Sequence, residues 1–87
     1  MLEIWKYTLH PGVQDVAMPE DSLVLTVQLQ QGIITLWARV KPSAPTSIRT
    51  FVVLGTGQPF ANDRLVYIGT VQDHWLVWHV LEDRGLR

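Results

Sequence analysis

Apolar and polar residues alternate along most of this chain, as expected of β-strands that bury one face. Over residues 23–30, one face carries Leu23, Leu25, Val27 and Leu29, and the other carries Val24, Thr26, Gln28 and Gln30. Gln31-Gly32 follows, and a glycine permits the positive φ that a tight hairpin requires. The alternation resumes over 33–40, with Ile34, Leu36, Ala38 and Val40 on one face. This pattern predicts a β-hairpin over residues 23–40.

The same period of two predicts four further strands. They are expected over residues 2–9, 47–57, 64–72 and 74–82, with Asp73 in the turn between the last two. Six short strands without a convincing helix predict an all-β fold. The architecture is then a small antiparallel six-stranded meander, a sandwich or a partly closed barrel.

Three segments between these strands are predicted to be connections. Residues 12–22 are expected to form a loop, because no helical stripe runs through them. Residues 41–47 contain two prolines, which also indicates a connection. Residues 58–64 are predicted to form one short helical turn, since Pro59 is acceptable in the first turn of a helix.

Two stretches of the chain share the pattern apolar-Gly-Thr-x-Gln, beginning at Leu54 and at Ile68. Their glycines, Gly55 and Gly69, are expected late in two neighbouring strands. A glycine inside a strand leaves a gap that a ring or a backbone can enter. The alternative is a chance match in a small β protein.

The composition is that of one small folded domain, residues 1–87. Hydrophobic residues make up 47% of the chain and charged residues 17%, which excludes a disordered chain. Four Trp, two Tyr and two Phe are much aromatic surface for 87 residues to bury. We therefore expect a homo-oligomer in which a second copy covers some of these rings.

The net charge of -1 disfavours binding to duplex nucleic acid, which needs a basic surface. The chain has no cysteine, so disulfides and thiolate chemistry are excluded and a cytoplasmic location is the default. No apolar run approaches the roughly 20 residues that span a bilayer. The start MLEIWKYTL also lacks the features of a signal peptide. We expect a soluble, unprocessed protein with no membrane association.

The segment Gly55-Thr56-Gly57 is a candidate for phosphate binding. A dinucleotide loop needs a third glycine and a following helix, and the other common phosphate loop needs a Lys-Ser/Thr pair. The sequence has neither feature here. A weaker prediction remains, in which the backbone amides of Gly55, Thr56 and Gly57 form a small anion-binding concavity. A plain strand end or bulge is the alternative.

The residues that most often carry catalysis or bind metals form no recognisable pattern. His74 and His79 are five apart and therefore fall on opposite faces of a strand, which disfavours a zinc site. His79 is expected to be partly buried and hydrogen-bonded. No serine occurs in a nucleophile motif beside a histidine, and no cleft brings two carboxylates together. The prediction is a non-catalytic protein without a cofactor or metal.

Three cations lie inside predicted strands next to aromatic residues. They are Lys6, Arg39 and Arg49. Rings beside cations on one face of a sheet form a platform on which a base stacks while charge holds its phosphate. The alternative is cross-strand pairing, with the arginine stems covering aromatic surface.

Several stretches resemble a family of short, uncharacterised proteins of bacteriophages and prophages. The most specific are IWKY at 4–7, GTGQP at 55–59 and YIGTVQ at 67–72, and the likeness extends over nearly the whole chain. The resemblance implies a viral origin and no known activity. Small non-catalytic phage proteins often act on their host by binding.

The resulting functional hypothesis is a protein in the cytoplasm of an infected bacterial host that antagonises a defence system by stoichiometric binding. In one version it sequesters a small anionic nucleotide signal. Charge then comes from Lys6, Arg39 and Arg49, stacking from Trp37, Tyr67 or Trp78, and backbone donors from Gly55, Thr56 and Gly57. In a second version it inhibits a host defence protein such as a CRISPR complex. A third hypothesis is a structural or virion-accessory protein.

Overall fold

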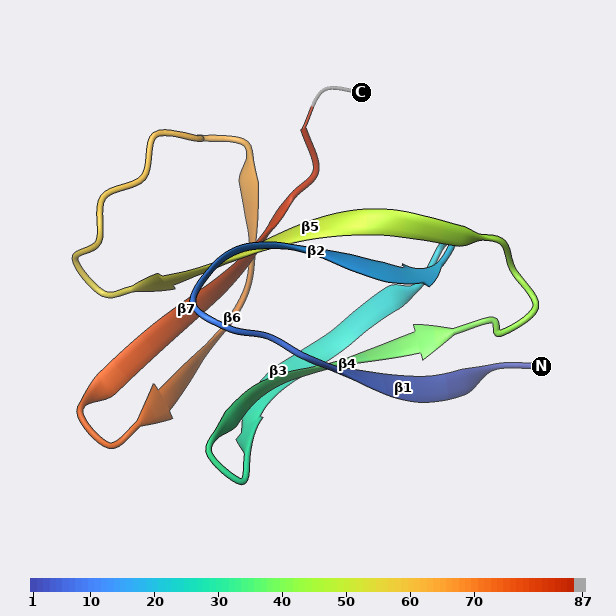
Figure 1. The fold of residues 1–87 in the computed structure, drawn as a ribbon, viewed down its shortest axis with the longest axis horizontal. Helices are drawn as coiled ribbons and strands as arrows, with labels where there is room; N and C mark the ends of the chain where they lie inside the picture. Colours follow the sequence, from blue (N-terminus) through green and yellow to red (C-terminus); the bar gives the residue numbers. More distant parts are fainter. Residues whose placement is uncertain (86–87) are drawn as a thin grey trace.

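A computed structural model describes residues 1–85 of the chain, and this part contains seven β-strands and no helix. The strands are β1 (Glu3–Thr8), β2 (Gly12–Pro19), β3 (Leu23–Gln30), β4 (Ile33–Val40), β5 (Thr46–Gly55), β6 (Leu65–Asp73) and β7 (Leu76–Asp83) (Figure 1). The all-β prediction is confirmed. The predicted count of six strands is wrong, because residues 12–19 pair as a strand. In these described residues no helix has the length and apolarity to cross a membrane.

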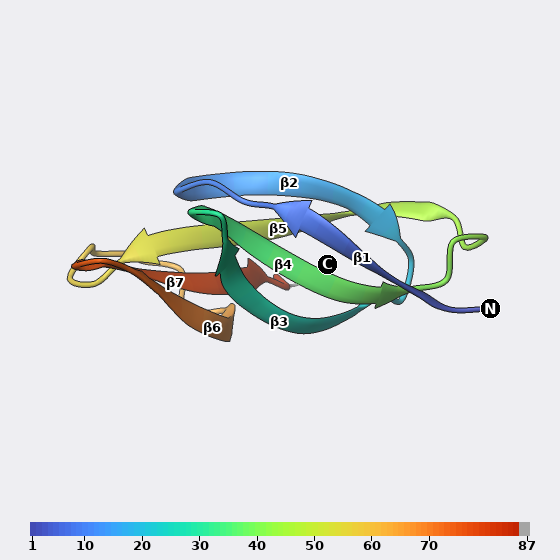
Figure 2. The ribbon, with the colours of Figure 1, turned by 90° about the horizontal axis from the view of Figure 1, so that it is seen from below.

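The strands form two antiparallel sheets, ordered β1-β4-β3 and β2-β5-β7-β6. The shortest extent of the molecule is 15 Å, which suits two layers packed about 10 Å apart. Figure 2 shows this flat form from the side, with β1 and β4 crossing in front of β5. Among the three predicted architectures, the sandwich describes the fold, since each sheet keeps its own edges and no barrel closes.

The unexpected strand β2 pairs with β5 from Gly12 to Pro19. Its alternation is hard to read because Val13 faces solvent, 68% exposed, while the polar Gln14 lies on the inner side. The Gln14 side chain exchanges hydrogen bonds with the backbone of His10, donating to its carbonyl and accepting from its amide, each at 2.7 Å. A polar residue thereby occupies an inward position without an unpaired group. Pro19 ends the strand at the edge of the sheet, where its missing N–H is tolerated.

The predicted hairpin between β3 and β4 is confirmed. Gln31 and Gly32 have φ values of 52° and 77°, as in the two-residue turn typical of hairpins. The register of β3 shifts between Val24 and Thr26, where a β-bulge adds one residue. The bulge leaves Leu23 and Leu25 exposed, so the predicted common face of Leu23, Leu25, Val27 and Leu29 is half wrong.

The main core lies between the two sheets. The four residues of β4 predicted to face inward are all buried; they are Ile34, Leu36, Ala38 and Val40. The opposing sheet contributes Phe51 and Val53 from β5 and Val80 from β7. Of the connection predicted over residues 41–47, residues 41–45 do connect β4 to β5, but Thr46 and Ser47 already belong to β5. Residues 58–64 contain no helical turn, so that prediction is wrong. The Asn62 side chain instead ties this loop to Asp83 of β7 and to the backbone amide of Arg64.

The two repeated glycines have different environments. Gly69 lies in the middle of β6, where the strand passes close to β3, and a Cβ atom there would sit 2.6 Å from Cγ1 of Val27. The gap at Gly69 is therefore filled by a side chain of the opposing sheet. Gly55 ends β5, and a Cβ atom there would meet the Trp78 ring at an ordinary 3.6 Å. The two glycines are not on neighbouring strands, because β7 lies between β5 and β6.

Candidate ligand-binding site

The nine residues proposed from sequence as a ligand site fall into separate places. Gly55, Thr56, Gly57 and Tyr67 share a pocket on the outer face of the four-stranded sheet. Lys6, Trp37 and Arg39 lie on the outer face of the three-stranded sheet, as the pairing and the burial of their neighbours show. Arg49 and Trp78 point inward, toward the space between the sheets. The structure therefore does not assemble the cations, rings and glycine turn into one site.

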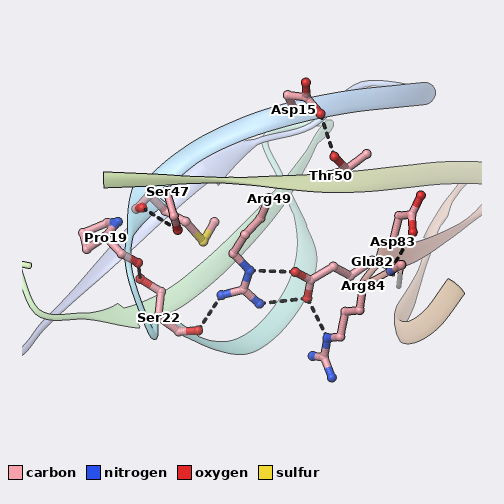
Figure 3. A network of polar contacts seen from close by, with 11 residues as sticks. Asp15, Pro19, Ser22, Ser47, Arg49, Thr50, Glu82, Asp83 and Arg84 are labelled. Carbon is pink, nitrogen blue, oxygen red and sulfur yellow. Dashed lines mark hydrogen bonds and ion pairs between the residues drawn. The ribbon is translucent and has the colours of Figure 1, made fainter. Parts of the chain in front are cut away.

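Arg49 is held in a polar network at one end of the core (Figure 3). Its Nε donates to Oε2 of Glu82 at 2.6 Å and its Nη2 donates to Oε1 at 2.8 Å, while Nη1 donates to the carbonyl of Ser22. Glu82 is 3% exposed and also accepts a hydrogen bond from Arg84. Arg49 further lies 5.9 Å from the centre of the Phe51 ring. Its charge is thus matched inside the protein and is not directed at the pocket.

The ionisation of this network follows from its contacts. Burial raises the pKa of Glu82, but the hydrogen bonds and charges of Arg49 and Arg84 lower it by more, so the net pKa lies below the usual carboxyl value. The hydrogen bond to Glu82 raises the pKa of Arg49, with burial opposing it. Tyr7 also reaches this region. Burial raises the pKa of Tyr7 more than the charge of Arg49 lowers it, and its hydroxyl has no hydrogen-bond partner among the described residues.

Lys6 and Arg39 share the outer face of the three-stranded sheet with the Trp37 ring, whereas Arg49, the third cation of the prediction, lies inside the protein. Lys6 is the cross-strand neighbour of Trp37, and its Nζ donates to Oε1 of Gln30 at 2.7 Å across β4. Arg39 also lines a polar pocket of about 450 Å³ together with Lys41, Glu20 and Asp21. The two cations of this pocket therefore share it with two carboxylates, and no aromatic side chain of the described residues lines it.

The pocket on the other sheet, which we call the outer-face pocket, has a volume of about 260 Å³. Its floor consists of Leu54 of β5 and Leu81 of β7, which are both buried. The rings of Phe60 and Tyr67 form walls and are 57% and 60% exposed. The loop after β5 supplies one side, because Asn62 fixes it to β7. The pocket thus has an apolar base and aromatic walls that no other part of the described chain covers.

The Gly55-Thr56-Gly57 segment closes one end of the pocket as a tight turn. The amide of Gln58 donates to the carbonyl of Gly55 at 3.0 Å, and Gly57 has a φ of 86°, which favours glycine. The amide of Gly55 donates to the side chain of Gln58 at 3.1 Å, and that of Thr56 donates to the carbonyl of Val77 at 3.3 Å. Two of the three amides expected to bind an anion are therefore occupied within the protein.

Four polar side chains form a continuous hydrogen-bonded series along the pocket, which we call the hydroxyl–imidazole series. The Tyr67 hydroxyl contacts Oγ1 of Thr70 at 2.6 Å. Oγ1 of Thr70 lies 2.9 Å from Nδ1 of His79, and Nε2 of His79 lies 2.6 Å from Oγ1 of Thr56. His79 is partly buried and bonded at both ring nitrogens, which confirms the expectation for this residue.

Sequence reasoning missed His79, Gln58 and Phe60 as parts of this site, and Thr70 as the residue behind it. A signal for the series was present in the repeated Gly-Thr pattern, because Thr56 and Thr70 are its two threonines. No signal pointed to Phe60, which reaches the pocket only through the path of the loop. In the described part of the chain, no three metal-ligating side chains cluster.

The fold and this pocket define a small two-sheet β protein with a pocket on the outside of one sheet. The chain belongs to the family described as a domain of unknown function, DUF7352, which matches residues 1–86. This family is consistent with the resemblance to uncharacterised proteins noted from the sequence. No curated protein and no solved structure matches the chain.

Proposed function

We propose that this protein is a non-catalytic binding protein that holds the aromatic ring of a small ligand, such as a nucleotide signal, in the outer-face pocket. The observation that carries the proposal is that two exposed rings, Phe60 and Tyr67, line the same pocket as the buried Leu54 and Leu81. Exposed aromatic walls around an apolar base, with a few polar groups at one end, are typical of small-ligand sites. Stacking on such rings does not require a strongly charged protein.

The contacts of His79 support binding over catalysis. In hydrolases that use a hydroxyl nucleophile and a histidine, a carboxylate usually holds the far ring nitrogen and stabilises the imidazolium. Here Nδ1 of His79 lies against the hydroxyl of Thr70 instead. A hydroxyl orients the ring but provides no charge to stabilise a proton transfer.

In its biological setting, we propose that the protein lowers the free concentration of a ligand that activates a bacterial defence. The resemblance to phage and prophage proteins supports that setting. Sequestration of this kind needs one binding site per copy and an abundant protein. The location that follows is the cytoplasm of an infected host.

Thermal denaturation with a panel of cyclic and linear nucleotides tests the proposal. A ligand that binds only the native state raises the melting temperature by mass action, by several degrees at saturating concentrations. Phe60→Ala should abolish the shift, because it removes one wall of the pocket while changing a largely exposed side chain. Ile33→Ala, an exposed apolar residue on the other sheet, serves as the matched control and should retain the shift. If no nucleotide shifts the wild-type protein, the proposal is wrong.

A second candidate, inhibition of a host defence protein, is favoured by the outer face of the three-stranded sheet. Three apolar residues there are about half exposed or more, around the partly buried Trp37; they are Ile4, Leu23 and Ile33. A second copy of the chain would cover the same face in a homo-oligomer. If this face binds a host effector, Ile33→Asp should abolish capture of that effector from lysate. If it binds a second copy of the chain, Ile33→Asp should abolish self-association measured by sedimentation. Recovery of the protein with virions would favour the virion-accessory alternative.

A further inference from the structure

The hydroxyl–imidazole series limits what the two ends of the pocket can offer a ligand. Its ends are the hydroxyls of Thr56 and Tyr67, which both line the outer-face pocket. Each hydroxyl carries one hydrogen, and a neutral imidazole carries one N–H and one acceptor nitrogen. The three hydroxyls and the neutral imidazole therefore carry four hydrogens, of which the three contacts of the series use three. One hydrogen remains for a ligand.

In one tautomer, Nε2–H of His79 donates to Oγ1 of Thr56. Nδ1 then accepts the hydrogen of Thr70, and the oxygen of Thr70 accepts the hydrogen of Tyr67. All three contacts are satisfied in this way. The free hydrogen is that of Thr56, so Thr56 donates to a ligand while Tyr67 has only lone pairs and accepts.

In the other tautomer the directions reverse. Thr56 donates to Nε2, and Nδ1–H donates to Thr70. Thr70 then donates to the oxygen of Tyr67, which leaves the hydrogen of Tyr67 for a ligand. In both tautomers of the neutral ring, the two ends present one donor and one acceptor to the pocket. Only a doubly protonated imidazole would make both ends donors, as a phosphate or carboxylate requires.

The other residues that line the outer-face pocket also favour a ligand whose bound part is uncharged. Within residues 1–85, no lysine or arginine lines the pocket, and the titratable side chains that do so are His79 and Tyr67. The oxygen of the Gln58 side chain already accepts a hydrogen bond from the amide of Gly55, and its N–H groups are left to donate. The floor of Leu54 and Leu81 leaves a phosphate without partners, and burying an unpaired charge there is strongly unfavourable.

From this geometry we infer that the outer-face pocket recognises an uncharged planar ring that carries a hydrogen-bond donor and an acceptor on one edge, as a nucleobase does. The ring stacks between Phe60 and Tyr67, and its edge meets the hydroxyls of Thr56 and Tyr67. Any phosphate attached to it remains in solvent at the mouth of the pocket. This inference rests on the proposed function and specifies the part of the ligand that is bound.

The test compares nucleosides with phosphates by calorimetry at about pH 8, where an imidazole is normally neutral. The probes are adenosine, guanosine, cytidine and uridine, their monophosphates, and ribose 5-phosphate. At least one nucleoside should bind within about threefold of its monophosphate, and ribose 5-phosphate should not bind. The affinity should change less than about twofold between low salt and about 0.5 M salt, since no ion pair holds the ligand.

Two conservative variants test the role of the hydroxyls. Thr56→Val and Tyr67→Phe remove one hydroxyl each and keep the shape of the side chain. Each should weaken nucleoside binding about tenfold, because a ligand group loses its partner. Thr26→Val, on the exposed outer face of the other sheet, is the matched control and should bind as the wild type does. Circular dichroism of all three variants checks that the fold is retained.

The outcomes separate this inference from the proposed function. If a monophosphate binds but its nucleoside does not, or if ribose 5-phosphate binds as well as the nucleotide, the inference is overturned while the proposed function stands. Nucleoside binding that is unchanged by both Thr56→Val and Tyr67→Phe also overturns it. If neither nucleosides nor nucleotides bind, the proposed function itself is wrong.

Discussion

Thr56 and Thr70 lie on either side of one imidazole, with their hydroxyls 2.6 Å and 2.9 Å from the two ring nitrogens of His79. The two threonines occupy equivalent places in the repeated Gly-Thr pattern, fourteen residues apart. They meet because β7, which carries His79, runs between β6, which carries Thr70, and β5, which Thr56 directly follows. A repeat in the sequence thus becomes a pair of matched contacts around a single histidine.

The role of Thr70 in this series gives the first prediction. Thr70 does not line the pocket and touches it only through His79 and Tyr67. Thr70→Val should therefore weaken ligand binding less than Thr56→Val does, by about threefold, because the imidazole loses the contact that orients it. In a ¹⁵N spectrum of the histidine ring, Thr70→Val should also change the tautomer populations of His79. Unchanged populations would show that Thr70 does not orient the ring.

The close approach of Gly69 to Val27 gives the second prediction. Gly69→Ala places a Cβ atom 2.6 Å from Cγ1 of Val27, so either the Val27 side chain or one of the two packed strands must shift. Overpacking of this kind costs about 1–3 kcal/mol of unfolding free energy. Urea denaturation measures the cost. The double variant Gly69→Ala with Val27→Ala should be more stable than the sum of the two single changes predicts, because the smaller residue vacates the space. Strict additivity would mean that the two positions do not touch.

The ion pair between Arg49 and Glu82 gives the third prediction. Glu82→Gln removes the charge that matches Arg49, whose side chain is 18% exposed. Changing one partner of a largely buried ion pair lowers the free energy of unfolding by about 3 kcal/mol, because the remaining charge stays buried away from water without its counter-ion. Arg39→Met, on an exposed strand position, is the control and should change the unfolding free energy by less than about 0.5 kcal/mol. Equal effects of the two changes would contradict the prediction.

The lowered pKa of Glu82 also predicts how stability depends on pH. A carboxyl whose pKa is lower in the folded than in the unfolded state stabilises the fold above the unfolded value, and this stabilisation is lost as the pH falls through the folded value. The melting temperature should therefore decline below the ordinary value of 4.5. The decline should be smaller in Glu82→Gln and unchanged in Glu20→Gln, which alters an exposed carboxyl. A decline of equal size in all three proteins would assign the effect to other groups.

Strands were predicted correctly from the sequence where apolar and polar residues alternate regularly, and were missed or misassigned where a side chain interrupts that alternation. The β3–β4 hairpin and the buried face of β4 were predicted because Ile34, Leu36 and Ala38 alternate without interruption. Strand β2 was missed because a polar residue, Gln14, occupies an inward position, where its side chain bonds with the backbone of His10. The alternation of apolar and polar residues that marks a strand is therefore interrupted there. The bulge after Val24 reversed the faces of β3, and a bulge depends on pairing with β4 that no local pattern reveals.

The candidate site was predictable only in part for a related reason. Gly55, Thr56, Gly57 and Tyr67 were selected from the sequence and do share a pocket. The cations were selected for their position in strands, but the direction of each side chain depends on which sheet the strand joins. Arg49 faces Glu82 because β5 pairs with β7, a pairing between strands separated by β6 in the sequence. Strand order is a long-range property, and it decides which side chains meet.

The hydroxyl of Tyr7 gives the last prediction. It is buried between the sheets near Arg49 without a hydrogen-bond partner among the described residues, and burial raises its pKa. Tyr7→Phe removes this unpaired polar group and keeps the ring that packs against the core. Because an unsatisfied buried hydroxyl costs about 1–3 kcal/mol, the variant should unfold at a higher urea concentration than the wild type. The difference should grow at alkaline pH. Because the pKa of Tyr7 is raised in the folded state, the wild-type protein loses stability as the pH rises above the ordinary value of 10.0, and the variant does not.

Tyr67→Phe, which changes an exposed ring on the other side of the molecule, is the matched control and should show no such gain. A loss of stability in Tyr7→Phe would mean that the hydroxyl has a partner, such as a buried water bridging it to the Arg49 network.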